Sequence, residues 1–366
     1  MTTKSFFAAA LCCMGLSFAT EASANSWRVN YDSRANADFL DLNAAMADER
    51  VADGDTLYMD KGCTISTTQT ISKAVTIIGP GYFIGENNAD EAYFSNTLTL
   101  SANGIKITGL HTSSIILEAS NLIIERCRVT GGIEANTKTS TDNISIRQCY
   151  IHNNSNLSCI DGYTKSTGWE IANNIIHNYY DSNNSDNYYT IKELKNAVID
   201  HNSIYNHSYL YNTSYKSYGL YNVTSSTITN NIIYSYNYYY STGGTDYSTI
   251  YNNGLSSNNI ISHNVLSGNS LSDYPNNKTL GSNFGTVYKS WPTSTFKDTY
   301  FILAETSPAI GYAEDGSDCG PFAGAYPYVL CGYPLYVPRF ESITVPSQPD
   351  ENGKLNIHMV IKNQNK

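Results

Sequence analysis

The sequence predicts an all-β protein in which short strands wind into a solenoid of stacked parallel coils. Three observations support this prediction. An eight-residue pattern recurs along the middle of the chain, apolar and polar residues alternate within each copy, and a second series of apolar positions falls between the copies. Alternation with a period of two is typical of strands rather than helices. Such a repeat buries its apolar side only against its neighbours, so the coils must stack.

The recurring pattern reads apolar, x, Ile, x, x, Cys or Asn, x, apolar. Clear copies begin at Leu122, Ile144, Trp169 and Ala197, and weaker copies follow them. The spacing between copies widens from 17 to 33 residues along the chain, so the longer coils must carry insertions in their turns. The third position of each copy is the anchor of a strand, and the anchors are Ile107, Ile124, Ile146, Ile171, Ile199, Ile228 and Ile261.

A second apolar series lies between the copies and supplies another strand to each coil. Stacked parallel strands lie about 4.8 Å apart. We therefore expect both series to form columns of Ile, Leu and Val through the interior. The members of the second series are Leu117, Ile133, Ile160, Ile191, Leu220 and Ile250.

One polar position of the pattern is repeatedly asparagine, namely Asn174, Asn202, Asn231 and Asn264. Asparagine tolerates the left-handed backbone of a tight turn. Its amide carries two donors and an acceptor, so identical side chains in successive coils can form a hydrogen-bonded ladder. Cys127 and Cys149 hold this position in two earlier copies, either as buried thiols or as a disulfide between adjacent coils.

Composition and charge exclude some functions. The 366-residue chain has 15% charged residues, a formal net charge of −10 and 31 tyrosines. A typical disordered chain is rich in charge and poor in aromatic residues, so this chain is not one. Nucleic acids and anionic membrane surfaces are bound mainly through Lys and Arg. Neither is an expected partner.

Residues 1–24 have the features of an export signal. Lys4 gives a positive start, an apolar run over 6–19 follows, and residues 22–24 (ASA) match a small-residue cleavage site. The apolar run is too short for a comfortable membrane span. We therefore expect an exported protein, in the periplasm, at the cell surface or outside the cell. Its mature chain would begin at Asn25, lack a transmembrane segment and be a monomer.

Two further motifs point to a family. A segment expected to be a short helix (39–46) precedes residues 52–58 (ADGDTLY), and residues 307–311 read SPAIG. Together with the asparagine column, these segments resemble the right-handed parallel β-helix proteins of the pectate-lyase-like superfamily. In those proteins a helix caps the first coil, a GDTIYL strand follows it, and an SPAI segment lies near the last coil. The resemblance covers residues 37–330, but the superfamily includes lyases, hydrolases, epimerases and adhesins, so it implies no single activity.

The resemblance and the repeats divide the chain into regions. Residues 25–62 form the N-terminal cap and first strand, residues 63–332 the right-handed parallel β-helix, and residues 333–366 a proline-rich C-terminal β extension. In the extension, 340–346 and 354–362 are expected to be two strands around a turn. We expect this hairpin to cap the solenoid; attachment of a partner is the alternative.

One outward-facing column is rich in charge. It consists of the residues that follow each member of the second apolar series, which are Glu118, Glu134, Asp161, Lys192, Tyr221 and Tyr251. Carboxylates stacked at strand spacing repel one another. Either Ca²⁺, which prefers oxygen ligands, or Lys192 would relieve that repulsion. Glu118, Glu134 and Asp161 are therefore candidate ligands of a calcium cofactor.

Lys192 is a candidate catalytic base. Residues 191–196 (IKELKN) resemble the lysine-bearing coil of alginate-lyase and chondroitinase-B-like enzymes. That resemblance implies that Lys192 removes the proton beside a substrate carboxylate, which a calcium ion neutralises. The arginine that those enzymes place one coil later is absent, because the equivalent stretch is 219–222 (GLYN).

A second outward column consists largely of rings, and its members are Thr130, His152, His177, Tyr205, Tyr234 and Ser267. A tyrosine ring offers an apolar face and a hydroxyl, which suits contact with sugars. The alternative is that these rings pack on one another between coils. The residues expected to contact a polysaccharide are Tyr205, Tyr221, Tyr234, Tyr251, His152 and His177.

Six cysteines remain once the export signal is removed, and an exported chain permits disulfides. Cys319 and Cys331 lie close together in a Gly-rich stretch and are the better candidate pair. Cys127 and Cys149 are the second candidate pair.

Three functional hypotheses follow from these features. The leading one is a protein that binds a polysaccharide or cell-surface glycan through tyrosine and asparagine residues. The second is a calcium-dependent polyuronate lyase that uses Lys192. The third is an adhesin or a surface-structural module, in which the solenoid acts as a rigid spacer.

Overall fold

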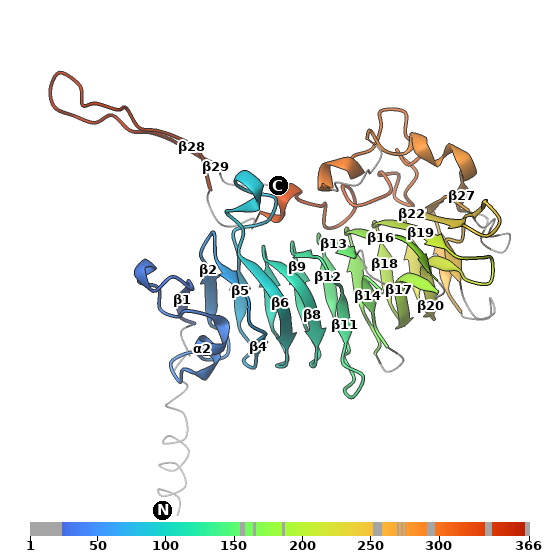
Figure 1. Cartoon of the computed structure of the whole chain (residues 1–366), viewed down its shortest axis with the longest axis horizontal. Coiled ribbons are helices and arrows are strands. Elements are labelled where there is room, and N and C mark those ends of the chain that lie inside the picture. The colour runs from blue at the N-terminus through green and yellow to red at the C-terminus, as the bar shows by residue number, and fades with distance from the viewer. Residues whose placement is uncertain are drawn as a thin grey trace, which may run out of the picture.

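The computed structural model describes residues 24–362, except 154–157, 164–165, 185–186, 252–257, 269–270, 272–273, 275, 291–296 and 334–338. Apart from Ala24, the predicted export signal lies outside the described residues. The described chain is a parallel β-helix in which strands of successive coils stack into long parallel sheets (Figure 1). The fold class predicted from the repeats is therefore confirmed.

The first sheet has ten strands, each paired in parallel with the strand of the next coil. Its register aligns every anchor isoleucine from Ile107 to Ile261 in one inward column, as predicted. The strands are β1 (Ser26–Val29), β2 (Thr56–Met59), β5 (Thr76–Ile78), β7 (Lys106–Thr108), β9 (Ile123–Glu125), β12 (Ser145–Arg147), β15 (Glu170–Ala172), β18 (Val198–Asp200), β21 (Thr227–Thr229) and β25 (Ile260–Ser262).

The remaining strands of the solenoid belong to a second extensive sheet system. Its first series is β3 (Thr64–Ile65), β6 (Tyr93–Leu100), β8 (His111–Leu117), β10 (Arg128–Val129), β13 (Tyr150–Asn153), β16 (Ile175–Asn184), β19 (Ser203–Leu210), β22 (Ile232–Tyr239), β26 (Val265–Leu266) and β27 (Lys278–Thr279). Its second series is β4 (Gln69–Ile71), β11 (Ile133–Ala135), β14 (Ile160–Asp161), β17 (Tyr188–Lys195), β20 (Ser217–Thr224) and β24 (Ile250–Tyr251), while β23 (Gly244–Asp246) pairs antiparallel with β22.

The N-terminal end is closed by the predicted helix, α2 (Leu42–Ala47), which follows the short 3₁₀ turn η1 (Ser33–Ala35). Asp41 caps α2, because its side chain accepts the N–H of Ala44 at 2.7 Å. The helix buries Leu42, Ala45 and Met46 in the core of the first coils. It thereby covers apolar side chains that the first coil would otherwise expose.

The asparagine column forms the predicted ladder. Asn202 Oδ1 accepts the N–H of Asn174 at 2.9 Å, and its amide donates to the carbonyl of Ile171 at 2.8 Å. The same arrangement repeats at Asn231 and Asn264, and all these side chains are fully buried. Asn277, which the repeat pattern did not include, accepts the Asn264 N–H at 3.0 Å and extends the ladder into the last coil.

After β27 the chain adds no further described coil, although the sequence predicted solenoid up to residue 332. Residues 281–290 and 297–333, here called the return segment, run back along the solenoid through η3 (Gly281–Thr286), η4 (Asp298–Phe301) and η5 (Leu330–Gly332). The 3₁₀ turns η3 and η4 pack on the coils through the buried side chains of Phe284 and Phe301. The return segment therefore covers one flank of the β-helix (Figure 1).

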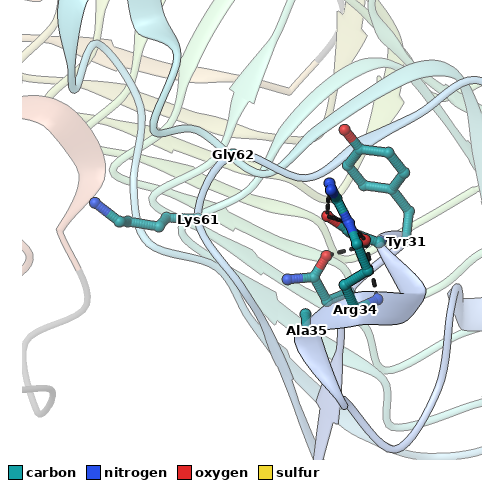
Figure 2. A pocket seen from close by; sticks show the side chains of 7 residues that line it. Tyr31, Arg34, Ala35, Lys61 and Gly62 are labelled. Atoms are coloured by element: carbon teal, nitrogen blue, oxygen red, sulfur yellow. Dashed lines mark hydrogen bonds and ion pairs between the residues drawn. The ribbon is translucent and has the colours of Figure 1, made fainter.

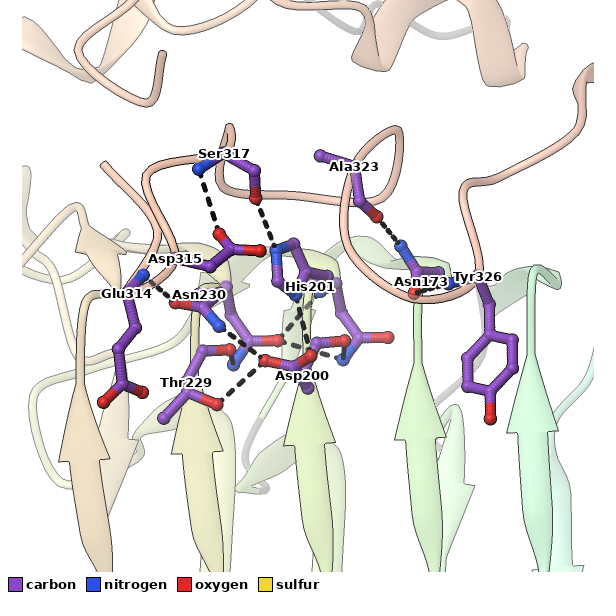
Figure 3. A network of polar contacts seen from close by, with 12 residues as sticks. Asn173, Asp200, His201, Thr229, Asn230, Glu314, Asp315, Ser317, Ala323 and Tyr326 are labelled. Carbon is purple, nitrogen blue, oxygen red and sulfur yellow. Dashed lines mark hydrogen bonds and ion pairs between the residues drawn. The ribbon is translucent and has the colours of Figure 1, made fainter. Parts of the chain in front are cut away.

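Left-handed turn residues fasten the return segment (Figure 3). These residues precede the ladder positions, and their side chains reach outward to the return segment. The Asn173 amide donates to the carbonyls of Pro321 and Ala323 at 2.9 and 2.5 Å. His201 bridges Asp200 at 2.7 Å and Ser317 at 3.4 Å. The ladder turn thus holds successive coils on its inner side and the return segment on its outer side.

The C-terminal extension forms an antiparallel ribbon of β28 (Arg339–Thr344) and β29 (His358–Lys362). Among the described strands these two pair only with each other, and the ribbon projects away from the solenoid (Figure 1). The predicted hairpin is confirmed, but the expectation that it caps the solenoid is wrong. The return segment covers the solenoid's flank instead.

Replacing one ladder residue should destabilise the whole solenoid. We expect Asn202→Ala to lower the free energy of unfolding by about 3 kcal/mol, because the Asn174 N–H and the Ile171 carbonyl would lose their buried partner. The matched control is Asn187→Ala, since exposed Asn187 also accepts a backbone N–H one coil away, that of Lys216 at 2.8 Å. Urea denaturation of both variants measures the difference. Equal losses would show that the ladder carries no special stability.

Candidate functional site

Five predicted residues form one outward column across adjacent coils. The register pairs Glu134 with Asp161, Asp161 with Lys192, Lys192 with Tyr221, and Tyr221 with Tyr251. Each comes directly after an inward Ile or Leu of β11, β14, β17, β20 or β24, so alternation turns it outward. We call this set the outer column. Neighbouring members lie about 4.8 Å apart, and the column spans roughly 20 Å.

Glu118 does not belong to the outer column. Ile133 pairs with Ile115, not with Leu117 as the sequence analysis assumed, so Ile116 is the residue beside Glu134. Glu118 instead accepts a hydrogen bond from the Asn136 amide at 2.7 Å. Ile115 and Leu117 both point inward and are fully buried, so a shift of two residues leaves the apolar pattern unchanged.

The charged part of the outer column is an ion pair beside a second carboxyl. Lys192 Nζ lies 3.0 Å from Asp161 Oδ2, and the Asp161 side chain is 5% exposed. Asp161 Oδ1 also accepts the N–H of Tyr163 at 3.0 Å. Burial raises the pKa of the neighbouring Glu134, and the Asp161 charge raises it further, whereas Lys192 opposes the shift. Glu134 therefore holds its proton more readily than an ordinary glutamate does.

These residues do not fit a calcium site. Glu118 lies outside the column, and Lys192 already occupies the oxygen of Asp161 that a cation would need. Within the described ranges, no three His, Cys, Asp or Glu side chains gather as metal ligands. The three predicted ligands are therefore not brought together.

The other end of the column is a cluster of tyrosines. Tyr221 stacks on Tyr189 with ring centroids 3.8 Å apart, and on Tyr251 with centroids 5.1 Å apart and planes within 5°. Tyr218 packs against Tyr251 at 4.9 Å. Stacked rings direct their faces at one another, so their edges and hydroxyls are what the cluster offers to a ligand. All four side chains are half-buried.

Tyr189 and Tyr218 were not among the predicted contact residues. They pair with each other and each lies two positions before an inward anchor, Ile191 or Leu220. Each also lies three positions before an outer-column residue, and strict alternation places residues three apart on opposite faces. Thr190 and Ile191 are both fully buried, so the alternation breaks between them, and the repeat pattern carries no signal for either ring.

The second ring column exists but is covered. His152, His177, Tyr205 and Tyr234 are in register, and the two histidines stack at 5.0 Å with planes 4° apart. His177 is fully buried, and Tyr205 and Tyr234 are 2% and 8% exposed. These three therefore do not present their rings to a ligand as predicted; the alternative interpretation, ring packing between coils, describes them. Half-buried His152 belongs to the same stack.

The cover comes from the return segment. Phe301 lies near His177 and Tyr205 with ring centroids 6.5 Å away, and Phe284 packs on Tyr234 at 5.1 Å. The sequence contained a signal for this cover. The consecutive pairs at 175–176 and 232–233 (both Ile-Ile) place an apolar residue on the outer face of each strand as well as on the inner face. Burial on both faces indicates a second layer.

Neither predicted disulfide is present, because none of the cysteines in the described chain forms one. The Cys149 thiol donates to the carbonyl of Arg147 at 3.2 Å, and its sulfur accepts the Cys127 N–H at 3.5 Å. Cys319 contacts the last coils, where its thiol donates to the His263 carbonyl at 3.2 Å. Cys331 instead lies against the first coils, since its carbonyl accepts the Tyr82 N–H. The return segment thus separates Cys319 from Cys331.

A shallow depression lies at the other end of the molecule, near β1 (Figure 2). Its lining includes Tyr31, Arg34 and Lys61. Arg34 forms an ion pair with Asp32 at 2.7 Å, and Lys61 lies 3.4 Å from Asp90. The depression has a single ring, Tyr31, whereas four tyrosines cluster at the outer column, so the outer column is the better candidate site.

Comparisons of the chain with protein-family models and with curated protein sequences found no match. No helix among the described residues is both long and apolar enough to cross a membrane. The assignment of the site therefore depends on its own geometry.

The covered ring column should make stability depend on pH. Burial lowers the pKa of His177 well below its ordinary value of 6.5 and that of His152 to about 4. The unfolded chain then binds more protons below pH 6.5, so stability present above that pH is lost as pH falls toward 4. We expect His177→Phe to flatten this slope by up to about 1.4 kcal/mol per pH unit.

Thermal denaturation between pH 4.5 and 7.5 measures the effect. The control is His358→Phe on the ribbon, because this exposed side chain is solvated in both states. A slope that is unchanged in His177→Phe would contradict the buried, neutral imidazole.

Proposed function

We propose that this protein binds a polysaccharide along the outer column. The observation that supports this most directly is that Asp161, Lys192, Tyr221 and Tyr251 lie in register on successive coils, with the ring of Tyr189 stacked on that of Tyr221. This face offers phenol hydroxyls, an ammonium group and carboxylates that repeat once per coil over several coils. A sugar polymer presents a row of hydroxyl groups that can donate to and accept from such a column.

Charge favours a neutral polysaccharide. The column contains two carboxyl groups and one lysine, and the lysine is paired with Asp161. The whole chain carries a formal net charge of −10. A polyuronate would bring further negative charge to this face, which electrostatic repulsion disfavours. Neutral hydroxyl groups can instead donate hydrogen bonds to carboxyl and phenol oxygens of this face without that cost.

We also propose that the chain is an exported member of the pectate-lyase-like superfamily. Support comes from the capping helix α2, the strand β2 that begins at the threonine of the GDTLY motif, and the asparagine ladder in the turn between strand series. Export rests on the sequence of residues 1–24 alone. A protein outside the cytoplasm would meet structural polysaccharides, which fits the proposed ligand.

Removing the central ring of the tyrosine cluster should weaken binding. We expect Tyr221→Ala to lower affinity about tenfold, because one aromatic anchor at the centre of a contact surface contributes on the order of 1.4 kcal/mol. Tyr221→Phe, which removes only the hydroxyl, should lose less. Affinity electrophoresis of the mature chain against neutral glucans, mannans, galactans and xylans measures both variants.

The matched control is Tyr211→Ala, because Tyr211 is 49% exposed but lies outside the outer column. The control should bind as the unmodified chain does. Equal losses in both alanine variants would count against the outer column. Absence of binding to every polysaccharide would overturn the proposal and leave the adhesin or surface-structural hypothesis.

A lyase that uses Lys192 is the second candidate function. Its support is the position of Lys192 between the carboxylates and the tyrosines of one face. The ion pair with Asp161 opposes it, because Lys192 Nζ is directed at a carboxylate 3.0 Å away, whereas a general base must direct a free lone pair at the substrate.

Ultraviolet absorbance of unsaturated uronate products tests the lyase directly. Purified mature protein is mixed with alginate, pectate and glycosaminoglycans, with and without calcium. We expect no increase in absorbance for the unmodified chain. An increase that disappears in Lys192→Ala would establish the lyase and contradict our preference for a neutral ligand.

A further inference from the structure

The C-terminal ribbon exposes a uniformly aliphatic face. Ile343 pairs directly with Met359, so both point to the same side, and Ile361 lies on that side because it is two residues from Met359. Val345, Ile357 and Leu355 continue the same alternation beyond the strand ends. All six side chains are strongly exposed, between 46% and 56%.

The opposite face of the ribbon is largely polar. Thr344 pairs with His358, and Ser342 pairs with Val360. A two-stranded sheet is marginally stable alone and gains stability when its apolar face packs on a second layer. Among the described elements, however, none packs on the ribbon, which projects from the solenoid (Figure 1). A contiguous exposed apolar surface of this kind marks an interaction site.

We propose that the aliphatic face of the ribbon docks onto the same face of a second copy of this chain. An uncharged aliphatic face is self-complementary, so a two-fold axis can bring two of them together as a small two-layer sandwich. It lacks the charged or hydrogen-bonding groups that would select a different partner surface. This inference is independent of the proposed polysaccharide binding.

Area and charge agree with this occupant. Two faces of six half-exposed aliphatic side chains would bury on the order of 1,000 Å² in total, at the lower limit for a specific interface. The contact should therefore be reversible, with a dissociation constant in the micromolar range. Because the ribbon projects outward, the two solenoids stay apart, and their net negative charges oppose any closer contact. The inference departs from the monomer expected from the sequence.

Sedimentation velocity of the full mature chain across roughly 1 µM to 1 mM tests the proposal. We expect a shift from monomer to dimer as concentration rises. Met359→Lys places a charge in the aliphatic face and should weaken dimerisation by at least tenfold. The matched control is His358→Lys, which carries the same new side chain one residue away on the opposite face and should dimerise like the unmodified chain.

Both substitutions are at exposed positions, so circular dichroism should report the same fold for each variant. A chain that stays monomeric up to 1 mM would overturn the proposal. So would a Met359→Lys chain that dimerises normally, since the contact would then lie elsewhere. A chain that is monomeric but binds neutral phosphatidylcholine vesicles through Met359 would also overturn it, by showing a lipid surface to be the occupant.

Discussion

In-register stacking of the coils is the constraint on which the rest of this molecule depends. Each coil buries its isoleucines against the next coil, and the amide of each ladder asparagine reaches both neighbours, as Asn202 does with Asn174 and Asn231. Once that register is set, every outward position is aligned as well. The outer column therefore depends on the packing of the core. Lys192 lies beside Asp161 and Tyr221 because the preceding residue, Ile191, pairs with Ile160 and Leu220.

The return segment covers one of two flanks of the solenoid that otherwise carry similar columns of aromatic rings. Both flanks carry columns of rings, but Phe284 and Phe301 cover the one that contains His177 and Tyr205, and the other stays open to solvent. Burial turns the covered rings into structural packing, with imidazoles that remain neutral. The open column keeps its phenols and the side chain of Lys192 half-buried rather than covered. The covering segment therefore determines which face can bind a ligand.

Local periodicity predicted the buried columns of the solenoid well, because each column appears in the sequence as a repeated pattern of Ile or Asn. The capping helix was expected from the resemblance of the N-terminal segment to the superfamily, and the ribbon strands from local alternation on either side of a turn. The position of Glu118 was not, since Ile115 and Leu117 satisfy the pattern equally and only coil-to-coil pairing separates them. The Ile-Ile pairs at 175–176 and 232–233 indicate a second layer over this flank, but the return segment has no repeat, so neither its path nor the distance between Cys319 and Cys331 could be derived from spacing.

The central claim is that a polysaccharide lies along the outer column, and hydroxyl-radical footprinting with mass spectrometry tests it at the level of single side chains. The mature protein would be oxidised with and without the neutral polysaccharide that binds best. The account predicts that the ligand protects Tyr189, Tyr218, Tyr221 and Tyr251, while Tyr31 and Tyr211, which are about half exposed, react as before. Protection of Tyr31 or Tyr211 with no change in the outer column would contradict it.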